Sequence, residues 1–476
     1  MKVAFIQLPH FYNNEKRPAT TYPLGIGYLA SSLKEDHHLV PVDLWVENAD
    51  VDRAMRMVSA DIPDVFCVST YSTQYPYYKE FVEALKRSYP NKKIIAGGPG
   101  ATFSYNVFLE KTPTDYCVIG EGDRTLKELL DKIDDPEGVD GIAYKKAGAV
   151  VLTKKREQIQ DLDSIPWPDR DFFDMERYIL NEQRSGSQFP GLRSSNLIAG
   201  RGCPYDCTFC SRTFYGSRFR SIRDIQKEIE HLKSAYSLGA VAFNDELVLI
   251  NKKRTLELCS ILKEIDIKWY CQGRINLVDE EILRAMKGSG CMRIGYGIES
   301  YTQRILDRMK KQIKAERILP AIEITKRVGI EPVIQYMYGF PGEDDDSIER
   351  TAEFFEKADH PYVGFTTTPI PGTELYRQAM KDNLIGDEEA YLYKLTSGFT
   401  MLEPLVNMTD FTYKDFVLKK LNLAKRVNSG YYKRHPLAFL KYSFKEVLRI
   451  SKVAITNPRV LFSRIKQKML RAQGRS

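Results

Sequence analysis

Apolar and polar residues alternate with two different periods along the first 140 residues. Short apolar runs typical of buried strands occupy residues 3–8, 39–44, 65–70, 93–96 and 116–119. Between them, apolar residues recur at helical spacing over residues 24–33, 51–58, 77–88 and 125–133. Strands and helices in strict alternation predict an α/β fold with a doubly wound, Rossmann-like parallel sheet, whose ligands bind at the carboxyl ends of the strands.

The same alternation returns between residues 196 and 376. Strand patterns occupy residues 196–199, 240–244, 269–272, 293–296, 331–338 and 363–368, separated by amphipathic helical patterns such as 222–236 and 253–265. Six such units predict a partial (β/α)6 barrel of the TIM type. Chemistry in such barrels collects at the carboxyl ends of the strands.

These patterns divide the chain into five parts. The first sheet takes residues 1–140, a linker 141–194, the barrel 195–385, a C-terminal extension 386–430 and a helical tail 431–476. Pro166 and Pro168 disfavour helix in the linker, which we expect to be extended there. The extension is either a lid that faces the substrate or a packing strap.

Composition narrows the cellular setting. Of 476 residues 43% are hydrophobic, and no apolar run approaches the ~20 residues of a membrane-spanning helix. The apolar start of the chain leads directly into a strand pattern, so we expect no secretory signal. Eight cysteines without paired spacing favour a reducing, cytoplasmic compartment.

Charge is concentrated at the end of the chain. The net charge is +7, yet residues 431–476 alone hold twelve lysines and arginines against one glutamate. The rest of the chain therefore carries a net charge of about −4, and we expect no nucleic-acid surface on it. Apolar residues interleaved with these cations predict one or two basic amphipathic helices, which either lie on the inner face of an anionic membrane or pack on the barrel with a solvated basic face. Membrane contact would favour a lipid-like substrate.

Three cysteines stand directly after the strand pattern at residues 196–199. Cys203, Cys207 and Cys210 fall within eight residues, and thiolates are soft ligands for zinc or iron–sulfur clusters. A closed structural zinc site would need a fourth ligand, and the other cysteines are single and distant. The spacing thus predicts a metal site with one open position, with structural zinc as the alternative.

The spacing Cys-x-x-x-Cys-x-x-Cys, with Phe209 before the last cysteine, resembles that of the radical S-adenosylmethionine (SAM) superfamily. The resemblance implies that the three thiolates hold three irons of a 4Fe–4S cluster and that the amino and carboxylate groups of SAM chelate the fourth. It also implies that Phe209 lies near the adenine.

Polar residues follow the predicted barrel strands. SAM presents an ammonium, a carboxylate and a ribose diol, which require an acidic group, a cation and hydrogen-bond acceptors. The resemblance implies that Asp245 or Glu246 meets the amino group, Arg274 the carboxylate and Glu299 the ribose. It implies too that Gly339 and Gly342 let the backbone approach the adenosyl group. A structural salt bridge remains the alternative for Arg274.

Turns of the first sheet resemble those of the cobalamin-binding domain found ahead of some radical SAM barrels. The residues implied to contact cobalamin are Leu24, Gly25, Ser69, Thr70, Gly97, Gly98, Gly120, Glu121 and Gly122. Two departures stand out: the chain lacks the Asp-x-His-x-x-Gly segment that supplies a histidine to cobalt, and Gly100 replaces a histidine of many relatives. The alternative is a sheet with a purely structural role.

The resemblance also implies a reaction. An electron from the cluster would cleave SAM to a 5'-deoxyadenosyl radical, and cobalamin would then methylate an unactivated carbon of the substrate. An electron donor such as flavodoxin or ferredoxin is implied as a partner. The alternatives are a cobalamin-dependent radical cyclase, oxidase or rearrangement enzyme and, from another class, a zinc-bound peripheral membrane scaffold.

Overall fold

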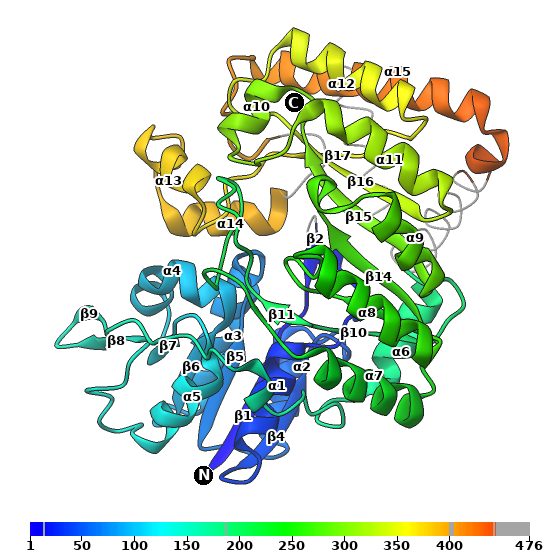
Figure 1. Ribbon diagram of the computed structural model, residues 1–476. Helices are drawn as coiled ribbons and strands as arrows, with labels where there is room; N and C mark the ends of the chain where they lie inside the picture. The colour runs from blue at the N-terminus through cyan, green and yellow to red at the C-terminus, as the bar shows by residue number, and fades with distance from the viewer. Residues whose placement is uncertain (13–14, 186–187, 399–403, 441–442, 444–476) are drawn as a thin grey trace.

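Two sheets stand side by side in the computed structural model, which describes residues 1–12, 15–185, 188–398, 404–440 and 443 (Figure 1). The first sheet has seven strands in the order β4-β1-β5-β6-β7-β8-β9, and the first five run parallel. Because the strand order reverses at β1, the crevice between β1 and β5 is the topological switch point at which such sheets bind ligands. Its strands are β1 (Lys2–Gln7), β4 (His38–Asp43), β5 (Val65–Ser69), β6 (Lys93–Gly97), β7 (Tyr116–Val118), β8 (Ile142–Lys146) and β9 (Ala149–Leu152).

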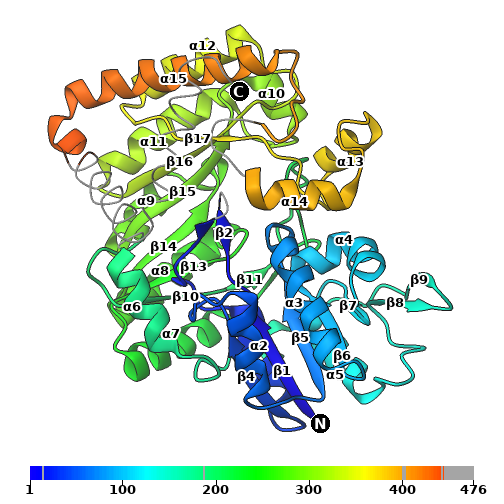
Figure 2. The ribbon, with the colours of Figure 1, turned by 180° about the vertical axis from the view of Figure 1, so that it is seen from behind.

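Helices cover both faces of this sheet, as Figures 1 and 2 show. Val3 and Phe5 share a core with α1 (Leu24–Leu33) and α5 (Gly122–Asp131), whereas Ala4 and Ile6 share the opposite core. That second core includes α2 (Val51–Ser59), α3 (Tyr75–Ser88) and α4 (Gly98–Lys111). The alternation of neighbouring residues between two cores explains why the strands read as continuous apolar runs. A small hairpin of β2 (Phe11–Tyr12) and β3 (Glu15–Lys16) follows β1.

The sequence patterns missed two features of the first sheet. Helix α4 begins at Gly98-Pro99-Gly100, residues that are typical of a turn. A helix can begin there because proline is well tolerated in the first turn of a helix. Strands β8 and β9 form an antiparallel hairpin on the edge strand β7, so the sheet extends into the segment expected to be linker. Strand β8 ends in two exposed lysines that shorten its apolar run, and β9 is only four residues long.

The rest of the connector binds the two sheets together. It contains the turn η2 (Leu162–Ser164) and α6 (Met175–Ser185), a helix within the segment expected to be linker. The Tyr22 hydroxyl donates to the Asp169 carbonyl at 2.5 Å, and the Trp167 indole donates to Asp224 at 2.9 Å. The stretch around the two prolines therefore runs from α1 to α7 (Ile222–Tyr236).

The second sheet has six parallel strands in sequence order. It consists of β10 (Ser194–Leu197), β13 (Ala240–Phe243), β14 (Lys268–Gly273), β15 (Cys291–Glu299), β16 (Glu331–Tyr338) and β17 (Gly364–Thr366). The helices between them are α7, α8 (Lys252–Ile265), α9 (Glu280–Gly288), α10 (Gln303–Arg308), α11 (Ile318–Arg327) and α12 (Asp345–Lys357), with short turns η3 (Ile275–Leu277) and η4 (Ala315–Arg317). The expected partial barrel is present.

Alternate barrel residues point outward into the helices. The Tyr296 hydroxyl meets Thr325 of α11 at 2.9 Å, and the Tyr336 hydroxyl meets Thr351 of α12 at 2.9 Å. Since neighbouring residues of a strand point to opposite faces, Gly295 and Gly297 lie on the inner face.

The C-terminal extension crosses from the barrel to the first sheet. It follows α13 (Glu374–Lys381) and contains α14 (Glu388–Gly398) and α15 (Tyr413–Arg434). Leu392 and Leu395 of α14 are buried in the core of α3 and α4, whereas Phe416 of α15 is buried in the barrel core. Most of the predicted tail 431–476 lies outside the described residues.

Candidate functional site

The three cysteines lie on a loop that is closed at its neck by two short strands. Strand β11 (Gly200–Arg201) pairs antiparallel with β12 (Arg218–Phe219), so the loop begins and ends at one point beyond β10. Gly202 has a φ of +86°, and a Cβ there would lie 2.3 Å from the Gly216 carbonyl oxygen. This close approach requires glycine. We name residues 200–219 the cluster loop.

The cluster loop is docked on the mouth of the barrel. The Thr208 amide donates to the Met309 carbonyl at 3.1 Å, and the Leu375 amide donates to the Thr208 carbonyl at 2.9 Å. Phe209 packs beside Met309, Phe340 and Leu375. Cys207 is buried, Cys203 partly buried and Cys210 exposed, so the loop is held by the barrel and remains open on one side.

Two cations lie next to the loop. Arg274, which follows β14, stacks 3.5 Å from the centre of the Tyr205 ring and places Nη1 3.9 Å from the Cys207 sulfur. Its Nη2 donates to the Lys311 carbonyl. The salt bridge left open by the sequence is not what holds Arg274: its contacts are with a ring, a sulfur and carbonyl or amide oxygens.

These surroundings favour a thiolate. A hydrogen bond with Cys210 and the charges of Lys311 and Arg274 together lower the pKa of Cys207 to about 6, against the opposing effect of burial. Burial raises the pKa of Cys203. Metal ligation by cysteine requires the deprotonated form, which the positive side chains around Cys207 stabilise.

Lys311 is a residue of this site that the sequence patterns did not reveal. It is buried, and its ammonium lies 3.1 Å from Glu299 Oε1 and 5.4 Å from the centre of the Phe209 ring. It follows α10 rather than a strand, and sequence Met309-Lys310-Lys311 does not show which lysine turns inward. A buried lysine beside the predicted adenine and ribose residues makes it a second candidate cation for the SAM carboxylate.

The two acidic residues after β13 have different surroundings. Asp245 is buried and accepts from the Ala199 amide at 2.9 Å, and burial raises its pKa to about 7. Glu246 is exposed and accepts from the Gly202 amide at 3.0 Å. Asp245 therefore holds the strand end that leads into the cluster loop, and Glu246 is the one accessible to a ligand.

Glu299, Gly339 and Gly342 all have left-handed backbone at the barrel mouth. Glu299 has a φ of +60° at a β-bulge of β15, which turns its carboxylate toward Lys311. A Cβ on Gly339 would lie 2.3 Å from the Phe416 ring, and one on Gly342 would lie 1.9 Å from the Arg308 guanidinium. Packing against Phe416 thus requires glycine at 339, and the left-handed backbone favours glycine at both positions. The approach of these glycines to an adenosyl group remains a prediction.

The candidate cobalamin residues lie at the carboxyl edge of the first sheet. Nothing lies within 4 Å of a Cβ built on Gly25, Gly97 or Gly120, so the backbone is bare at all three positions. Leu24 begins α1 and packs near Ile159, and Ser69 ends β5 beside Gly98. Such bare backbone around a switch point suits a large ligand.

Thr70 organises the turn that follows β6. It is fully buried, its hydroxyl donates to the Gly97 carbonyl at 3.0 Å, and the Ala101 amide donates to that hydroxyl at 3.1 Å. A Cβ on Gly98 or Gly100 would lie 2.7 Å from a Thr70 oxygen. The histidine of many relatives therefore has no room at position 100 in this chain.

The Glu121 side chain points toward the cluster loop, and Gly122 packs beside Leu29. The Glu121 carboxylate binds Arg201 at 2.5 Å and Arg218 at 3.1 Å, both on the neck of the cluster loop. A Cβ on Gly122 would meet Leu29 at 3.3 Å. The structure thus brings Glu121 to the cluster loop, whereas the neighbouring Gly120 has open space beside it.

Loops at the carboxyl ends of both sheets are in contact. Glu121, after β7, meets Arg201, after β10, and a Cβ on Gly372, after β17, would lie 2.4 Å from Phe103 of α4. The two ligand-binding edges therefore face one another.

His10 is a further residue that the sequence patterns did not single out. It follows β1 at the switch point and lies between Trp45 and Tyr71, with ring centres 4.3 Å and 5.1 Å away. Burial lowers its pKa to about 4, so its imidazole is neutral at pH 7.

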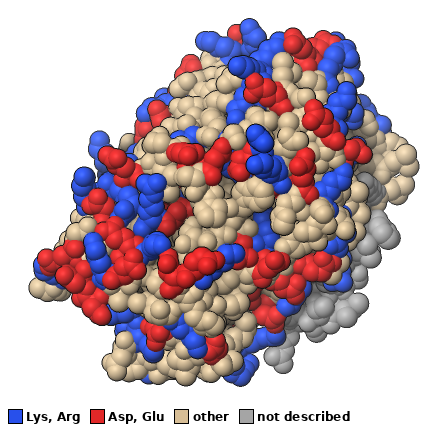
Figure 3. Space-filling model, turned by 60° about the horizontal axis from the view of Figure 1, so that its bottom comes forward, with Lys and Arg blue, Asp and Glu red and all other residues tan. Residues whose placement is uncertain are grey.

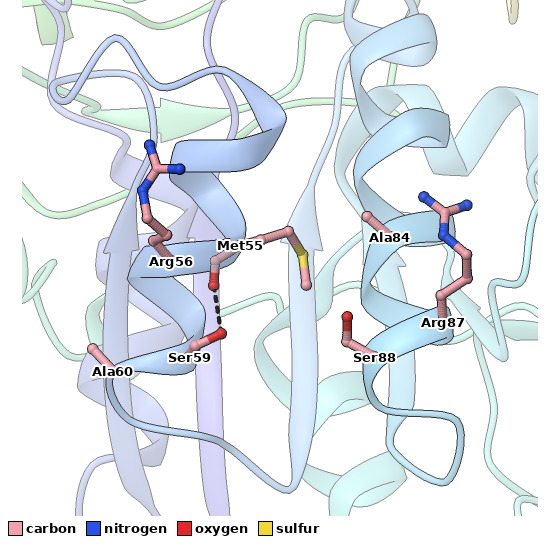
Figure 4. A pocket seen from close by; sticks show the side chains of 7 residues that line it. All are labelled: Met55, Arg56, Ser59, Ala60, Ala84, Arg87 and Ser88. Carbon is pink, nitrogen blue, oxygen red and sulfur yellow. Dashed lines mark hydrogen bonds between the residues drawn. The ribbon is translucent and has the colours of Figure 1, made fainter.

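One surface groove lies away from this edge. A groove of about 520 Å³ runs between α2 and α3, lined by Met55, Arg56, Ser59, Ala60, Ala84, Arg87 and Ser88 (Figure 4). It is formed by the carboxyl halves of these helices, which return to the amino ends of the strands, so it is remote from the edge described above. On the face seen in Figure 3, acidic and basic side chains are interspersed.

Among the residues that the structure describes, no three histidine, cysteine or acidic side chains converge on the position of one metal ion. The ligands of an iron–sulfur cluster bind different irons and need not converge. Nor is any described helix long and apolar enough to cross a membrane.

A loop of three cysteines at the mouth of a partial barrel, facing the ligand-binding edge of a second sheet, fits a two-sheet α/β enzyme with a metal-cluster site. The family model of the radical SAM superfamily matches residues 197–355, and that of the B12 binding domain matches residues 13–130. An uncharacterized methyltransferase of Pyrococcus horikoshii is 31% identical over 401 residues, which cover 82% of this chain and 84% of the relative. The chain belongs to the cobalamin-binding radical SAM enzymes.

Two further comparisons widen this picture. The anaerobic magnesium-protoporphyrin IX monomethyl ester cyclase of Rubrivivax gelatinosus is 27% identical over 410 residues, covering 82% of this chain and 72% of the relative. The fold is similar to that of the radical SAM methyltransferase TsrM from Kitasatospora setae, with a TM-score of 0.64 at 15% identity over 81% of this chain and 77% of that one.

Family membership confirms the α/β fold class, the enzymatic nature and the cofactors implied by the sequence: a 4Fe–4S cluster, SAM and cobalamin. The zinc-bound scaffold gains no support. The residues at both edges fit these groups in donor chemistry and in bare backbone.

Proposed function

We propose that this enzyme methylates an unactivated carbon of a small-molecule substrate. The observation that carries the proposal is the contact between the carboxyl edges of the two sheets. Cofactors bound at those edges would share one crevice, in which a substrate could reach both. The similarity to a methyltransferase over most of both chains supports the same reaction.

Each residue of the barrel mouth has a proposed task. Cys203, Cys207 and Cys210 hold the cluster, and Glu246 accepts from the SAM amino group while Asp245 fixes the strand end behind it. Lys311 and Arg274 bind the carboxylate, and Glu299 faces the ribose. Phe209 lies against the adenine, with the backbone at Gly339 and Gly342 near the adenosyl group.

The first sheet is proposed to hold cobalamin through Leu24, Gly25, Ser69, Thr70, Gly97, Gly98, Gly120 and Gly122. When bound, the cluster supplies the electron that cleaves SAM, and cobalamin supplies the methyl group. The chain itself orients these groups and excludes water, which is the main contribution of a protein to radical chemistry.

A cyclase is the second candidate reaction, because a cyclase is also among the relatives. The mass of the product separates the two. Anaerobically reconstituted enzyme with cobalamin, SAM and a reductant such as flavodoxin or ferredoxin should add one methyl group to a host metabolite. Loss of hydrogens without a methyl group would instead support the cyclase.

The central experiment replaces a cluster ligand. Cys207→Ala should lose most of its iron and sulfide and all formation of 5'-deoxyadenosine, because a cluster with a missing thiolate is not retained. Cys259→Ala, which alters a buried cysteine of α8, should keep both. Normal turnover by Cys207→Ala would overturn the proposal.

We further propose that the end of the chain lies on an anionic membrane and that the substrate is lipid-like. Leu437, Phe439 and Leu440 are 80%, 49% and 62% exposed where the basic segment begins, and exposed apolar side chains beside cations are typical of such contacts. Anionic liposomes should sediment the full chain but not a chain ending at residue 430. Equal sedimentation would contradict membrane contact without affecting the reaction.

A further inference from the structure

Four charged side chains join the cluster loop to the first sheet. Arg201 and Arg218 stand opposite each other on the neck strands β11 and β12. Glu121 precedes α5, and Asp123 lies in the first turn of that helix. We name these four residues the neck quartet.

The neck quartet is buried and densely bonded. Arg201 binds Asp123 through two nitrogens, at 2.8 Å and 3.1 Å, and Glu121 at 2.5 Å. Arg218 donates to both Glu121 oxygens, at 3.2 Å and 3.1 Å, and to the Ile159 carbonyl. The side chains of Arg201, Arg218 and Glu121 are 7% exposed and that of Asp123 10%.

Removing Glu121 would leave Arg218 buried without a carboxylate, and removing Arg201 would leave Asp123 buried without a cation. Two cations balance two anions, and Glu121 is the carboxylate that pairs with Arg218. Burial alone would lower the pKa of Arg201, yet Asp123 and Glu121 raise it. Paired charges at such burial hold fixed geometry, because a displaced partner is poorly compensated by solvent.

The turn that contains Gly120 and Glu121 borders two different parts of the molecule. On one side, Gly120 has a φ of +79° and no atom within 4 Å of a Cβ position. On the other, Glu121 holds the neck of the cluster loop and also accepts from the Ile159 amide at 2.9 Å. This one short turn thus borders the proposed cobalamin crevice and also binds the neck of the cluster loop.

From this arrangement we infer that Glu121 and Asp123 are positioning residues that couple the two cofactor sites. This inference rests on the proposed cobalamin site and changes the role of Glu121, which positions the neck rather than touching cobalamin. Assembly of the cluster orders the cluster loop, and the neck quartet transmits that order to the turn at Gly120. Cobalamin therefore binds more tightly to the cluster-loaded protein.

The coupling can be measured without turnover. Hydroxocobalamin is titrated by absorbance into cluster-free and cluster-loaded full-length protein, and the ratio of the two dissociation constants is the coupling. Wild type should show a ratio of about tenfold, and Glu121→Gln a ratio near one. Glu128→Gln is the matched control, since Glu128 lies on α5 and pairs with Lys132 and Arg156, neither of which is a member of the neck quartet; it should keep the wild-type ratio.

Other outcomes separate the possible failures. If Glu121→Gln weakens binding in both states by one factor and keeps the ratio, Glu121 only stabilises the fold or contacts cobalamin, and the inference is wrong. Equal affinities in both states of wild type contradict the coupling alone, whereas absence of any cobalamin binding contradicts the proposed function. Should Glu121→Gln not fold, Asp123→Asn, which leaves Glu121 charged, carries the same comparison.

Discussion

At the scale of single residues, burial and direction decide roles that residue type leaves open. Asp245 and Glu246 are neighbours with similar side chains, yet one is buried against a backbone amide and the other is exposed. Lys310 and Lys311 differ in the same way: Lys310 is exposed and pairs with Glu374, whereas Lys311 is buried against Glu299. Adjacent residues at the end of a helix point in different directions, and only the packing of that helix determines which points inward.

Lys311→Met tests the role of the buried lysine. The change removes a cation from the proposed SAM site and leaves Glu299 buried without its partner. We expect the dissociation constant of SAM to rise about tenfold or more, as for loss of a charge-assisted hydrogen bond, measured by equilibrium dialysis on cluster-loaded protein. Lys310→Met should bind SAM as wild type does; equal affinity of both variants would contradict the assignment.

Protonation of the buried Glu343 carboxyl group should make the unfolding free energy depend on pH. Burial raises its pKa to about 7, partly offset by hydrogen bonds from the Gly339 amide and the Tyr336 hydroxyl. Because the folded state holds this proton more tightly than the unfolded chain, the contribution is complete below its ordinary pKa and is lost as the pH rises through about 7. Glu343→Gln should flatten the fall in unfolding free energy between about pH 4.5 and pH 7 by 1–3 kcal/mol, measured by urea unfolding.

A control for this pH dependence is Glu349→Gln, which changes an exposed carboxylate of α12 that pairs with Arg426. Its pH profile between those limits should follow wild type. A Glu343→Gln profile parallel to wild type would show that the carboxyl group is not protonated in the folded state.

At the scale of elements, the sequence predicts helices and strands that have a clear apolar period. It misses helix α4, which begins with Gly-Pro-Gly, and the two-residue strands of the neck. Residues 24–33, 222–236 and 331–338 were predicted with the bounds that α1, α7 and β16 have. Helix α4 was missed because its Gly-Pro-Gly start is typical of a turn, and its close approach to Thr70 requires glycine for tertiary reasons. The neck strands β11 and β12 were missed because two-residue strands carry no period.

Gly339→Ala tests how α15 is attached to the barrel. A Cβ at this position would overlap the Phe416 ring, and its φ of +83° is strained for alanine. We expect a loss of about 1–3 kcal/mol in unfolding free energy from overpacking and backbone strain. Gly386→Ala, where nothing lies within 4 Å, should stay close to wild type in the same urea titration; equal stability of the two variants would show that Phe416 moves aside freely.

At the scale of the whole molecule, the extension expected to be either a lid or a strap packs as a strap. Helix α14 reaches α3 through Glu389, which binds the Tyr75 hydroxyl at 2.8 Å and Lys79 at 2.7 Å. Glu388 accepts from Ser104 of α4 at 3.0 Å. Together with the connector and the neck quartet, these contacts hold the two edges face to face.

Leu392→Ala tests this strap. Leu392 is fully buried between α14 and the first sheet's helices, so its truncation should cost about 2–5 kcal/mol in unfolding free energy. The matched variant Leu384→Ala, at a site 45% exposed, should cost far less. If both variants lose similar amounts of unfolding free energy in thermal or urea unfolding, the packing of α14 contributes little to the contact between the two sheets.

The sequence by itself determined the alternation of strands and helices, the two sheets and the cysteine loop, because these depend on local periodicity and on the spacing of residues a few positions apart. The tertiary structure alone decided which acidic residue is accessible, that Lys311 belongs to the site and that Glu121 grips the cluster loop. Each of these depends on contacts between segments distant in the chain, such as the 80 residues between Glu121 and Arg201. Local patterns carry no information about such contacts, which form only when the packed cores bring the two carboxyl edges together.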